Sequence, residues 1–243
     1  MNFFLKEKKA GAITGKLLKF RFSAKDELSI EKTNIIDSLG LAIFKSHRVV
    51  ERGGGEEDRG QYEQSEQVFG VSGAASMFRR KALEDVQFPI SNSQFSIYFD
   101  KDFFAYKEDV DLSFRLRHAG WQCWYVPKAL AWHDRWERGS GQKEKAFDIL
   151  KRRKKRLRFV NYLSYRNHLM MLFKNEFAIN LVIYFPWIFL YELKKFIYIL
   201  FFETRNIIAF LNFLAFLPLT LKKRHDILSK SKINPKEIRS WII

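Results

Sequence analysis

The sequence predicts an α/β protein, and three observations lead to this prediction. Strand-like and helix-like patterns alternate over the first 140 residues, which is typical of a sheet covered by helices. The chain has 243 residues and is 47% hydrophobic, enough for a substantial core and too apolar for a disordered chain. The net charge of +16 is concentrated after residue 140, so we expect two parts with different surroundings.

The first segments of the chain predict short elements separated by polar loops. A helix ends within residues 1–9, and strands follow over 11–20 and 33–44. The segment 51–67 is the most polar of the chain and contains three consecutive glycines, which predicts a mobile surface loop. Its length leaves two interpretations open, a plain linker or a functional loop.

The next segments predict a strand that runs into small residues (68–80) and a short helix (81–86). A helix is expected over 108–119 because acidic side chains crowd its first turn and Gly120 follows its end. The run 121–127 predicts a strand that its terminal proline stops.

Charge and hydropathy change after residue 140. Residues 1–140 carry 22 basic and 20 acidic side chains, whereas 141–243 carry 21 basic and 7 acidic ones, and we divide the chain there. The stretch 151–174 predicts a basic amphipathic helix.

Two uncharged runs follow in this second part, 177–191 and 206–221. Both are shorter than the roughly 18 to 20 residues of a spanning helix, and each contains a proline. Flanking Lys, Arg, Trp and Tyr suit lipid headgroups, so we expect helices lying in the membrane interface. A tilted hairpin that dips into the bilayer is the alternative.

Several classes are disfavoured. The only cysteine, Cys123, lies in an apolar run and predicts a buried thiol in a reducing compartment. The chain begins without the apolar segment of a signal peptide, and it contains no phosphate-binding glycine motif and no Ser–His–Asp set. The basic run 151–158 invites a nucleic-acid interpretation, but it adjoins apolar aromatic helices, so we expect a membrane partner and no nucleic acid.

Glu108, Asp109 and Asp111 form the densest acidic cluster. Three acids in four positions repel one another unless a helix N-terminus, a metal ion or Arg115 supplies positive charge. A carboxylate there can be a general base or a metal ligand; the alternative is ordinary acids of a helix N-terminus. His133 is a second candidate metal ligand, with a structural histidine as its alternative.

Four segments follow one another in order: IIDSLG (35–40), the loop, strand and helix of 53–86, the F-D-x-x-F-F, E-D-x-D-L, G-W and H pattern of 99–133, and YRN (165–167) before apolar helices. Together they resemble the second half of a family 2 glycosyltransferase of the bacterial rhamnosyltransferase-like kind. The resemblance covers residues 5–175 well and the rest loosely.

The resemblance implies a GT-A (Rossmann-like) α/β fold and transfer of a sugar from a nucleotide-sugar donor with inversion. Asp109 would be the general base, and His133 would help hold a divalent cation, Mg²⁺ or Mn²⁺, on the diphosphate. The residues implied to bind or shape the acceptor and substrate site are Glu108, Asp111, Arg115, Gly73 and Trp121. For Trp121, core packing beneath the helix is the favoured alternative, and the 51–67 loop would close over donor or acceptor.

The chain departs from the family pattern at its start, where members carry a nucleotide-binding half that ends in an acidic metal motif. We therefore expect a partial GT-A domain (1–140) that lacks this half, followed by a basic amphipathic region (141–243), and little or no transferase activity from this chain alone. The extended loop 87–98 is a smaller departure, so we expect a different acceptor shape there.

The predicted function is that of an inverting glycosyltransferase fragment, peripheral to the cytoplasmic face of the plasma membrane. It would act on a glycan or lipid-linked acceptor in bacterial surface polysaccharide synthesis, and its basic region would contact anionic lipid. The alternative is a non-catalytic membrane-binding or scaffold fragment that complements a partner carrying the donor-binding half.

Overall fold

The computed structural model describes residues 2–22, 29–88, 97–134 and 157–243. A five-stranded mixed sheet with the order β2-β1-β7-β5 lies at its centre, and β6 pairs with β1. Among the described strands of this sheet, β1 and β7 run parallel and the other pairs are antiparallel. A separate ribbon joins β3 and β4. The strands are β1 (Ala10–Phe22), β2 (Ile30–Ser38), β3 (Leu41–Ile43), β4 (Val49–Glu51), β5 (Glu66–Val68), β6 (Ser76–Phe78) and β7 (Gln122–His133).

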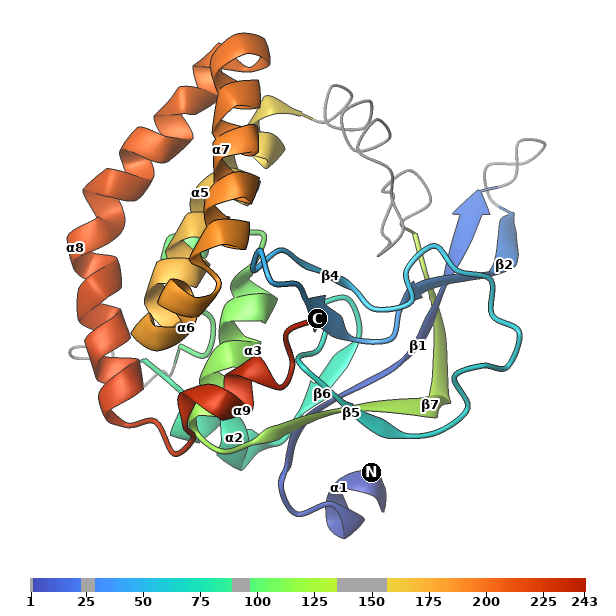
Figure 1. The fold of residues 1–243 in the computed structure, drawn as a ribbon. Helices are drawn as coiled ribbons and strands as arrows, with labels where there is room; N and C mark the ends of the chain where they lie inside the picture. Colours follow the sequence, from blue (N-terminus) through green and yellow to red (C-terminus); the bar gives the residue numbers. More distant parts are fainter. Residues whose placement is uncertain (1, 23–28, 89–96, 135–156) are drawn as a thin grey trace.

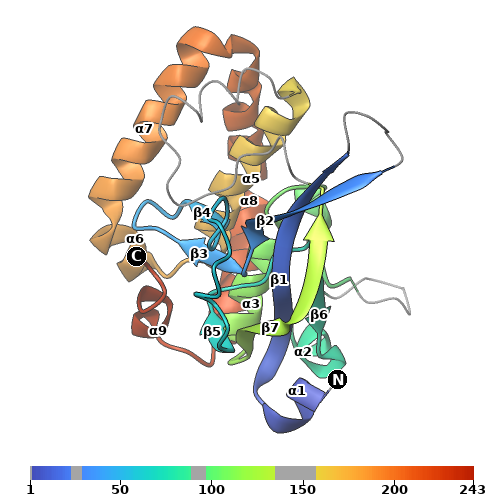
Figure 2. The same cartoon turned by 90° about the vertical axis from the view of Figure 1, so that its right-hand side faces the viewer.

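The long helices form a layer on one side of this sheet, as both ribbon views show (Figures 1 and 2). Helix α3 lies between that layer and the sheet. The helical elements are α1 (Asn2–Lys6), α2 (Arg80–Asp85), η1 (Lys101–Phe103), α3 (Glu108–His118), α5 (Arg158–Asn175), α6 (Ala178–Ile183), α7 (Phe185–Phe202), η2 (Thr204–Asn206), α8 (Ile207–Ser229) and α9 (Pro235–Arg239). The predicted α/β class is confirmed.

Several local predictions are confirmed. The short helix after the small-residue segment is α2, and the acidic start of α3 and its end before Gly120 match the capping pattern. Gly120 has a φ of 81°, the left-handed conformation expected after a helix. The Cys123 side chain is fully buried in the core.

Two strand predictions were wrong in their bounds. The run 33–44 is two strands, because the chain turns at Gly40, whose φ of 105° favours glycine. Strand β7 does not stop at Pro127 but continues to His133. Its pairing with β1 shifts register between Tyr125 and Leu130, so the missing N–H of Pro127 falls where no regular ladder bond is needed.

The polar segment 51–67 has defined contacts with the sheet. Its backbone lies along β2, with hydrogen bonds from Gly55 N–H to Ile36 O (2.8 Å) and from Asp58 N–H to Asn34 O (2.7 Å). The Lys16 ammonium binds the Asp58 carboxylate at 2.8 Å and contacts Glu63 as well. One of the three glycines that predicted a mobile loop, Gly55, thus donates to a strand at the sheet edge, and closure over a ligand stays a prediction.

Helix α3 is buried on opposite faces by two apolar clusters. Leu112 and Leu116 face the sheet and pack with the cluster that contains Cys123. Val110 and Phe114 face the other helices and join a cluster with side chains of α5, α8 and α9. This second cluster contains residues from both sides of the boundary at residue 140, so the described residues of the two predicted parts share a core.

Helix α5 differs from the basic amphipathic helix predicted for 151–174. It begins at Arg158, and residues 151–156 lie outside the described part of the chain. Most of its side chains are buried, including the polar Asn161, Arg166, Asn167 and Lys174, because α5 packs between α3 and α8. The polar residues that the pattern assigned to a solvated face instead meet buried partners.

Three carboxylates and three cations form a buried ionic network between α3, η1, α5 and α8. Lys174 binds Asp100 (2.6 Å) and Asp111 (2.7 Å). Arg115 binds Asp111 (2.9 Å) and donates to the carbonyl oxygens of Val86 and Tyr98. Lys223 completes the network by binding Asp100 at 2.6 Å and Asp102 at 2.7 Å.

The network determines the ionisation of its members. Burial alone would raise the pKa of Asp100, but Lys174 and Lys223 outweigh it and lower that pKa to about 2. Burial lowers the pKa of Lys174, and the attraction of Asp111 and Asp100 opposes this. Asp100 therefore contributes stability that is present above pH 4 and is lost as the pH falls toward 2.

We expect Lys174→Met to destabilise the fold by about 3 to 5 kcal/mol, because it leaves two buried carboxylates without their shared cation. The measurement is denaturant unfolding at neutral pH. The control is Lys230→Met, an exposed lysine, which should unfold like the unchanged protein. Equal stability of both variants would contradict a structural role of the network.

Candidate functional site

Asp109 lies in the first turn of α3 with both carboxylate oxygens in contact with backbone N–H groups. Oδ2 accepts a hydrogen bond from Gly73 N–H (2.9 Å), and Oδ1 accepts one from Val110 N–H (2.8 Å). The side chain is half-buried, and the helix N-terminus attracts its negative charge. The structure thus brings together Asp109 and Gly73, which are 36 residues apart in the sequence.

The segment after β5 carries Gly73 across α3. A Cβ at Gly70 would lie 2.5 Å from the Ser113 side chain, so glycine permits this close crossing. Val71 N–H then donates to the Ser113 hydroxyl (3.3 Å), and Ser113 donates to the carbonyl oxygen of Asp109 (2.8 Å). Gly73 is exposed, and a Cβ there would be in ordinary contact with Asp109, 3.5 Å from its Cβ.

A group of hydrogen-bonded polar side chains that the sequence did not single out lies next to Gly73, beginning at Ser72. Glu51, at the end of β4, accepts hydrogen bonds from the hydroxyls of Ser72 (3.2 Å) and Ser38 (2.6 Å). Asp37 precedes Ser38 in β2, and its Oδ2 lies 3.0 Å from Nδ1 of His133. The motif IIDSLG contains Asp37 and Ser38, but a single sequence assigns no role to them, since their partners come from β4 and β7.

Glu108 precedes the candidate base and is poorly solvated. Burial raises the pKa of Glu108, and repulsion by Asp109 adds to this. Among the described residues, no hydrogen-bond partner faces its buried Oε2. The charged form of Glu108 is therefore disfavoured, whereas the Asp109 carboxylate accepts two backbone N–H bonds.

Lys107 supplies a cation beside these acids. Its ammonium group donates to the carbonyl oxygen of Val49 (3.1 Å). Burial lowers the pKa of Lys107, the attraction of Asp109 opposes this, and repulsion from Lys195 adds to it, so that the pKa is about 8. The sequence alone does not single out Lys107, because its neighbours come from distant segments.

Three of the residues predicted to bind substrate lie elsewhere. Asp111 and Arg115 are almost fully buried within the ionic network, where they connect α3 to its neighbours rather than face a ligand. Trp121 follows the opposite end of α3, where its indole N–H donates to Asp85 (3.1 Å) and its ring lies against Gly11. Roles in acceptor binding stay predictions for all three, and the packing alternative for Trp121 fits its surroundings.

The described residues provide an incomplete set of metal ligands. His133 and Asp37 form one pair, but no group of three His, Cys, Asp or Glu side chains with metal-binding geometry occurs in the described ranges. A divalent cation needs more ligands than this pair supplies. We therefore derive no chemical step through a metal ion.

We expect Glu108→Gln to stabilise the protein increasingly as the pH rises. At pH 4, below the ordinary glutamate pKa of 4.5, the wild-type carboxyl is mostly protonated in both states, so the two proteins should differ least there. At pH 8 the raised pKa means that the folded wild type bears the cost of a poorly solvated charge, which glutamine avoids. Thermal unfolding from pH 4 to 8 measures this, with the exposed Glu57→Gln as control. A pH-independent difference would contradict the assignment.

Comparisons with known proteins place the chain in a family. The model of the family described as glycosyl transferase family group 2 matches residues 42–220, which include Gly73, Asp109 and His133. Neither a curated protein nor a solved structure matches the chain. The mixed sheet covered by helices fits a GT-A-like domain. Since the match spans well over half of the chain, the protein belongs to the family 2 glycosyltransferases.

Proposed function

We propose that the chain forms the acceptor-side catalytic part of an inverting glycosyltransferase, with Asp109 as the general base. The observation that supports this most directly is the carboxylate at the start of α3, held by Gly73 N–H and Val110 N–H in a family 2 domain. Family membership indicates glycosyl transfer from a nucleotide-sugar to an acceptor in general. Hexosyl or rhamnosyl specificity and a role in bacterial surface polysaccharide synthesis are parts of the proposal.

In the proposed reaction Asp109 accepts the proton of the acceptor hydroxyl. The acceptor oxygen forms its bond to the anomeric carbon as the bond to the nucleoside diphosphate breaks on the opposite face, which inverts the configuration. The two N–H donors orient the carboxylate, so it is held in place before substrate arrives. A divalent cation, Mg²⁺ or Mn²⁺, remains part of the proposal, with His133 as its candidate ligand from this chain.

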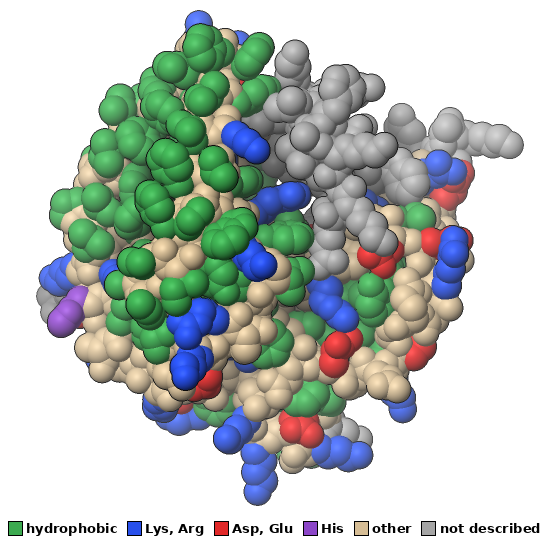
Figure 3. All heavy atoms as spheres, viewed as in Figure 1, with side chains coloured by type: hydrophobic (Ala, Val, Ile, Leu, Met, Phe, Trp, Pro, Cys, Tyr) green, Lys and Arg blue, Asp and Glu red, His purple; other side chains and the backbone are tan. Residues whose placement is uncertain are grey.

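A second part of the proposal concerns the membrane. Helices α6, α7 and α8 expose a broad apolar surface, visible in Figure 3 as green side chains over the helical layer. We define this surface, the apolar face, by Val182, Phe185, Phe189, Leu190, Leu193, Ile197, Phe201, Phe202, Ile208, Leu211 and Leu214, all more than a third exposed. A contiguous patch of this kind marks a partner or a membrane.

The borders of the apolar face favour a lipid surface. Trp187 and Tyr184 lie in ring contact where it meets the sheet domain, and the Lys45 ammonium lies 5.7 Å from the Trp187 ring. Aromatic and basic side chains are typical of the headgroup level. The helical stretch Thr204–Ser229, which joins η2 and α8, has the length and composition to cross a membrane. Arg205 is exposed at the turn between α7 and α8. Because a charged side chain at this tip opposes deep insertion, it favours helices that lie in the membrane interface.

We therefore propose a peripheral location at the cytoplasmic face of the plasma membrane, with anionic lipid as partner and a glycan or lipid-linked acceptor. The basic run 151–156, which the sequence analysis assigned to lipid contact, lies outside the described residues. The alternative function, a non-catalytic scaffold for a partner with the donor-binding half, shares this location and differs in its need for Asp109.

We expect Asp109→Asn, introduced at the native locus, to reduce glycan product about 10² to 10⁴-fold, the usual effect of losing a general base. Mass spectrometry of surface polysaccharide and lipid-linked glycans measures this, because a missing sugar changes the glycan mass whatever the donor is. The control is Asp226→Asn, an exposed carboxylate of α8, which should behave as wild type. Full product from the Asp109 variant would overturn the base assignment and favour the scaffold alternative.

We expect Phe189→Glu/Leu193→Glu to weaken binding to anionic phospholipid vesicles more than ten-fold. Burying each large apolar side chain contributes roughly 1.5 to 3 kcal/mol, and glutamate removes this gain and adds repulsion. Flotation of the purified protein measures binding. Met77→Glu changes an equally exposed apolar residue of β6 and should bind normally. Equal binding of both variants would contradict docking through the apolar face.

A further inference from the structure

The loop between η1 and α3 has a backbone conformation that L-amino acids rarely adopt. Phe104 (φ 60°), Tyr106 (φ 69°) and Lys107 (φ 74°) are three of the four non-glycine residues with positive φ in the described ranges. Phe104, with ψ −65°, is the centre of a γ-turn that Ala105 N–H closes onto Phe103 O (2.7 Å). Such conformations are unfavourable for residues with a side chain, so other contacts must hold the loop.

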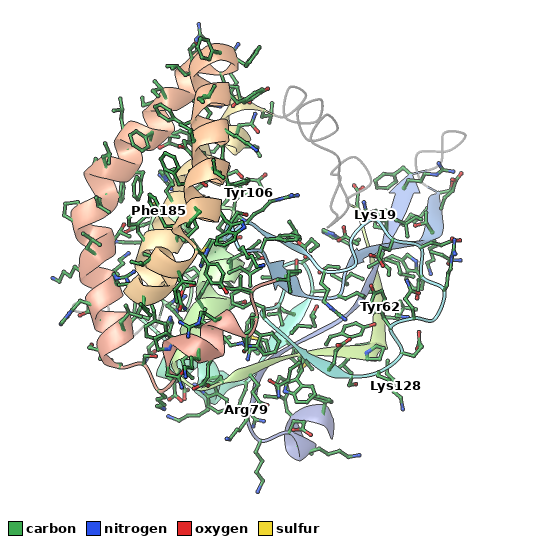
Figure 4. The ribbon with its side chains drawn as sticks, viewed as in Figure 1. Lys19, Tyr62, Arg79, Tyr106, Lys128 and Phe185 are labelled. Atoms are coloured by element: carbon green, nitrogen blue, oxygen red, sulfur yellow. The ribbon has the colours of Figure 1, made fainter. Side chains whose placement is uncertain are left out.

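One buried carboxamide on α5 makes these contacts. Asn167 Nδ2 lies 2.7 Å from the carbonyl oxygens of Phe103 and Ala105 and 2.8 Å from that of Tyr106. Asn167 is completely buried, so water does not compete for these bonds. The labelled Tyr106 lies on the helical side of the molecule with Phe185, whereas Lys19, Tyr62 and Lys128 lie on the sheet side (Figure 4).

Arg166 determines which way this carboxamide faces. Its Nε donates to Asn167 Oδ1 (2.9 Å), which leaves the amide nitrogen directed at the loop. Its Nη2 donates to the carbonyl oxygen of Asp102 (2.7 Å), one residue before the loop. The two side chains together bind four backbone carbonyl oxygens just before α3, those of Asp102, Phe103, Ala105 and Tyr106.

The loop ends where the candidate base begins. Lys107 is the N-cap of α3, and its carbonyl oxygen accepts the first helical hydrogen bond from Asp111 N–H (2.9 Å). Asp109 follows two residues later and meets Gly73. If the loop relaxed to ordinary backbone angles, the first turn of α3 would rotate, and the hydrogen bond between Gly73 N–H and Asp109 would be lost.

We propose that Asn167, oriented by Arg166, is a positioning residue that holds the loop 103–107 in its strained conformation and thereby holds Asp109 against Gly73. The proposal rests on the proposed function only for the chemical role of Asp109. It assigns part of the catalytic geometry to α5, in the basic region that the sequence analysis assigned to the membrane.

The test is amide hydrogen exchange by NMR on the full chain. We expect Asn167→Ala to speed exchange at Gly73 and at residues 103–107 at least ten-fold, because the loop loses its donors. The matched control is Asn161→Ala, another buried asparagine of α5, whose carboxamide faces Glu203 instead. It should leave exchange at Gly73 unchanged. Exchange at Gly73 within two-fold of wild type in the Asn167 variant would overturn the proposal.

A second variant separates positioning from general destabilisation. Phe104 is highly exposed, so Phe104→Gly removes little packing and relieves the strain. We expect Phe104→Gly to restore slow exchange at Gly73 in part when combined with Asn167→Ala, which a merely unstable fold would not show. Should Asn167→Ala not fold, Arg166→Lys removes the orienting bond and should produce the same change to a smaller extent; an unchanged Gly73 amide there would equally overturn the proposal.

Glycan product measured at the native locus distinguishes this proposal from the proposed function. We expect Asn167→Ala to reduce product about ten- to hundred-fold and Asn161→Ala to leave it unchanged. If Asp109→Asn abolishes the product but Asn167→Ala in the same assay still gives full product, the positioning role would be overturned. Full product from Asp109→Asn would overturn the proposed function instead, and exchange at Gly73 would still decide whether Asn167 holds the loop.

Discussion

Helix α3 is enclosed by protein on nearly every side, and this enclosure constrains the rest of the structure. Burying a helix with acids, arginines and a histidine is costly unless each charge finds a partner. Its partners come from elements far apart in the chain: Lys174 of α5 for Asp111, the carbonyl oxygens of Val86 and Tyr98 for Arg115, and that of Asn175 for His118. Arg117 of the same helix donates to the carbonyl oxygens of Phe69 and of Val68 in β5, so the polar groups of α3 connect the sheet to the helical layer.

The same arrangement explains why a reactive carboxylate can be placed accurately. Asp109 is on the first turn of α3, which reaches the surface, while the rest of the helix is immobilised by packing and ion pairs. Strain in the loop 103–107 is balanced by bonds to α5, and Gly73 approaches from the opposite side. Groups held by a rigid surrounding need little reorganisation when substrate binds.

The helical region contacts the protein core on one side and forms an exposed apolar surface on the other. Its inner side chains complete the core and the ionic network of the transferase domain, and its outer side chains form the apolar face. This division explains the unusual polarity of α5, whose buried Asn167 and Arg166 bind backbone carbonyl oxygens and whose apolar residues fill the core. A site that depends on these helices would be close to any lipid surface that the apolar face contacts.

The sequence by itself determined the α/β class, helix α3 with its acidic first turn and its end before Gly120, the buried cysteine and the family, because these depend on local periodicity, local charge and motif order. Asp109 and Gly73 could also be selected from motifs. Only the tertiary structure decided that Asp111 and Arg115 belong to a buried network and that β7 continues past Pro127. It also decided that Glu51 binds Ser72 beside Gly73 and that Asn167 binds the loop before α3. The physical reason is that burial and pairing join residues dozens of positions apart, and periodicity in a single sequence carries no information about which distant partner a polar side chain will meet.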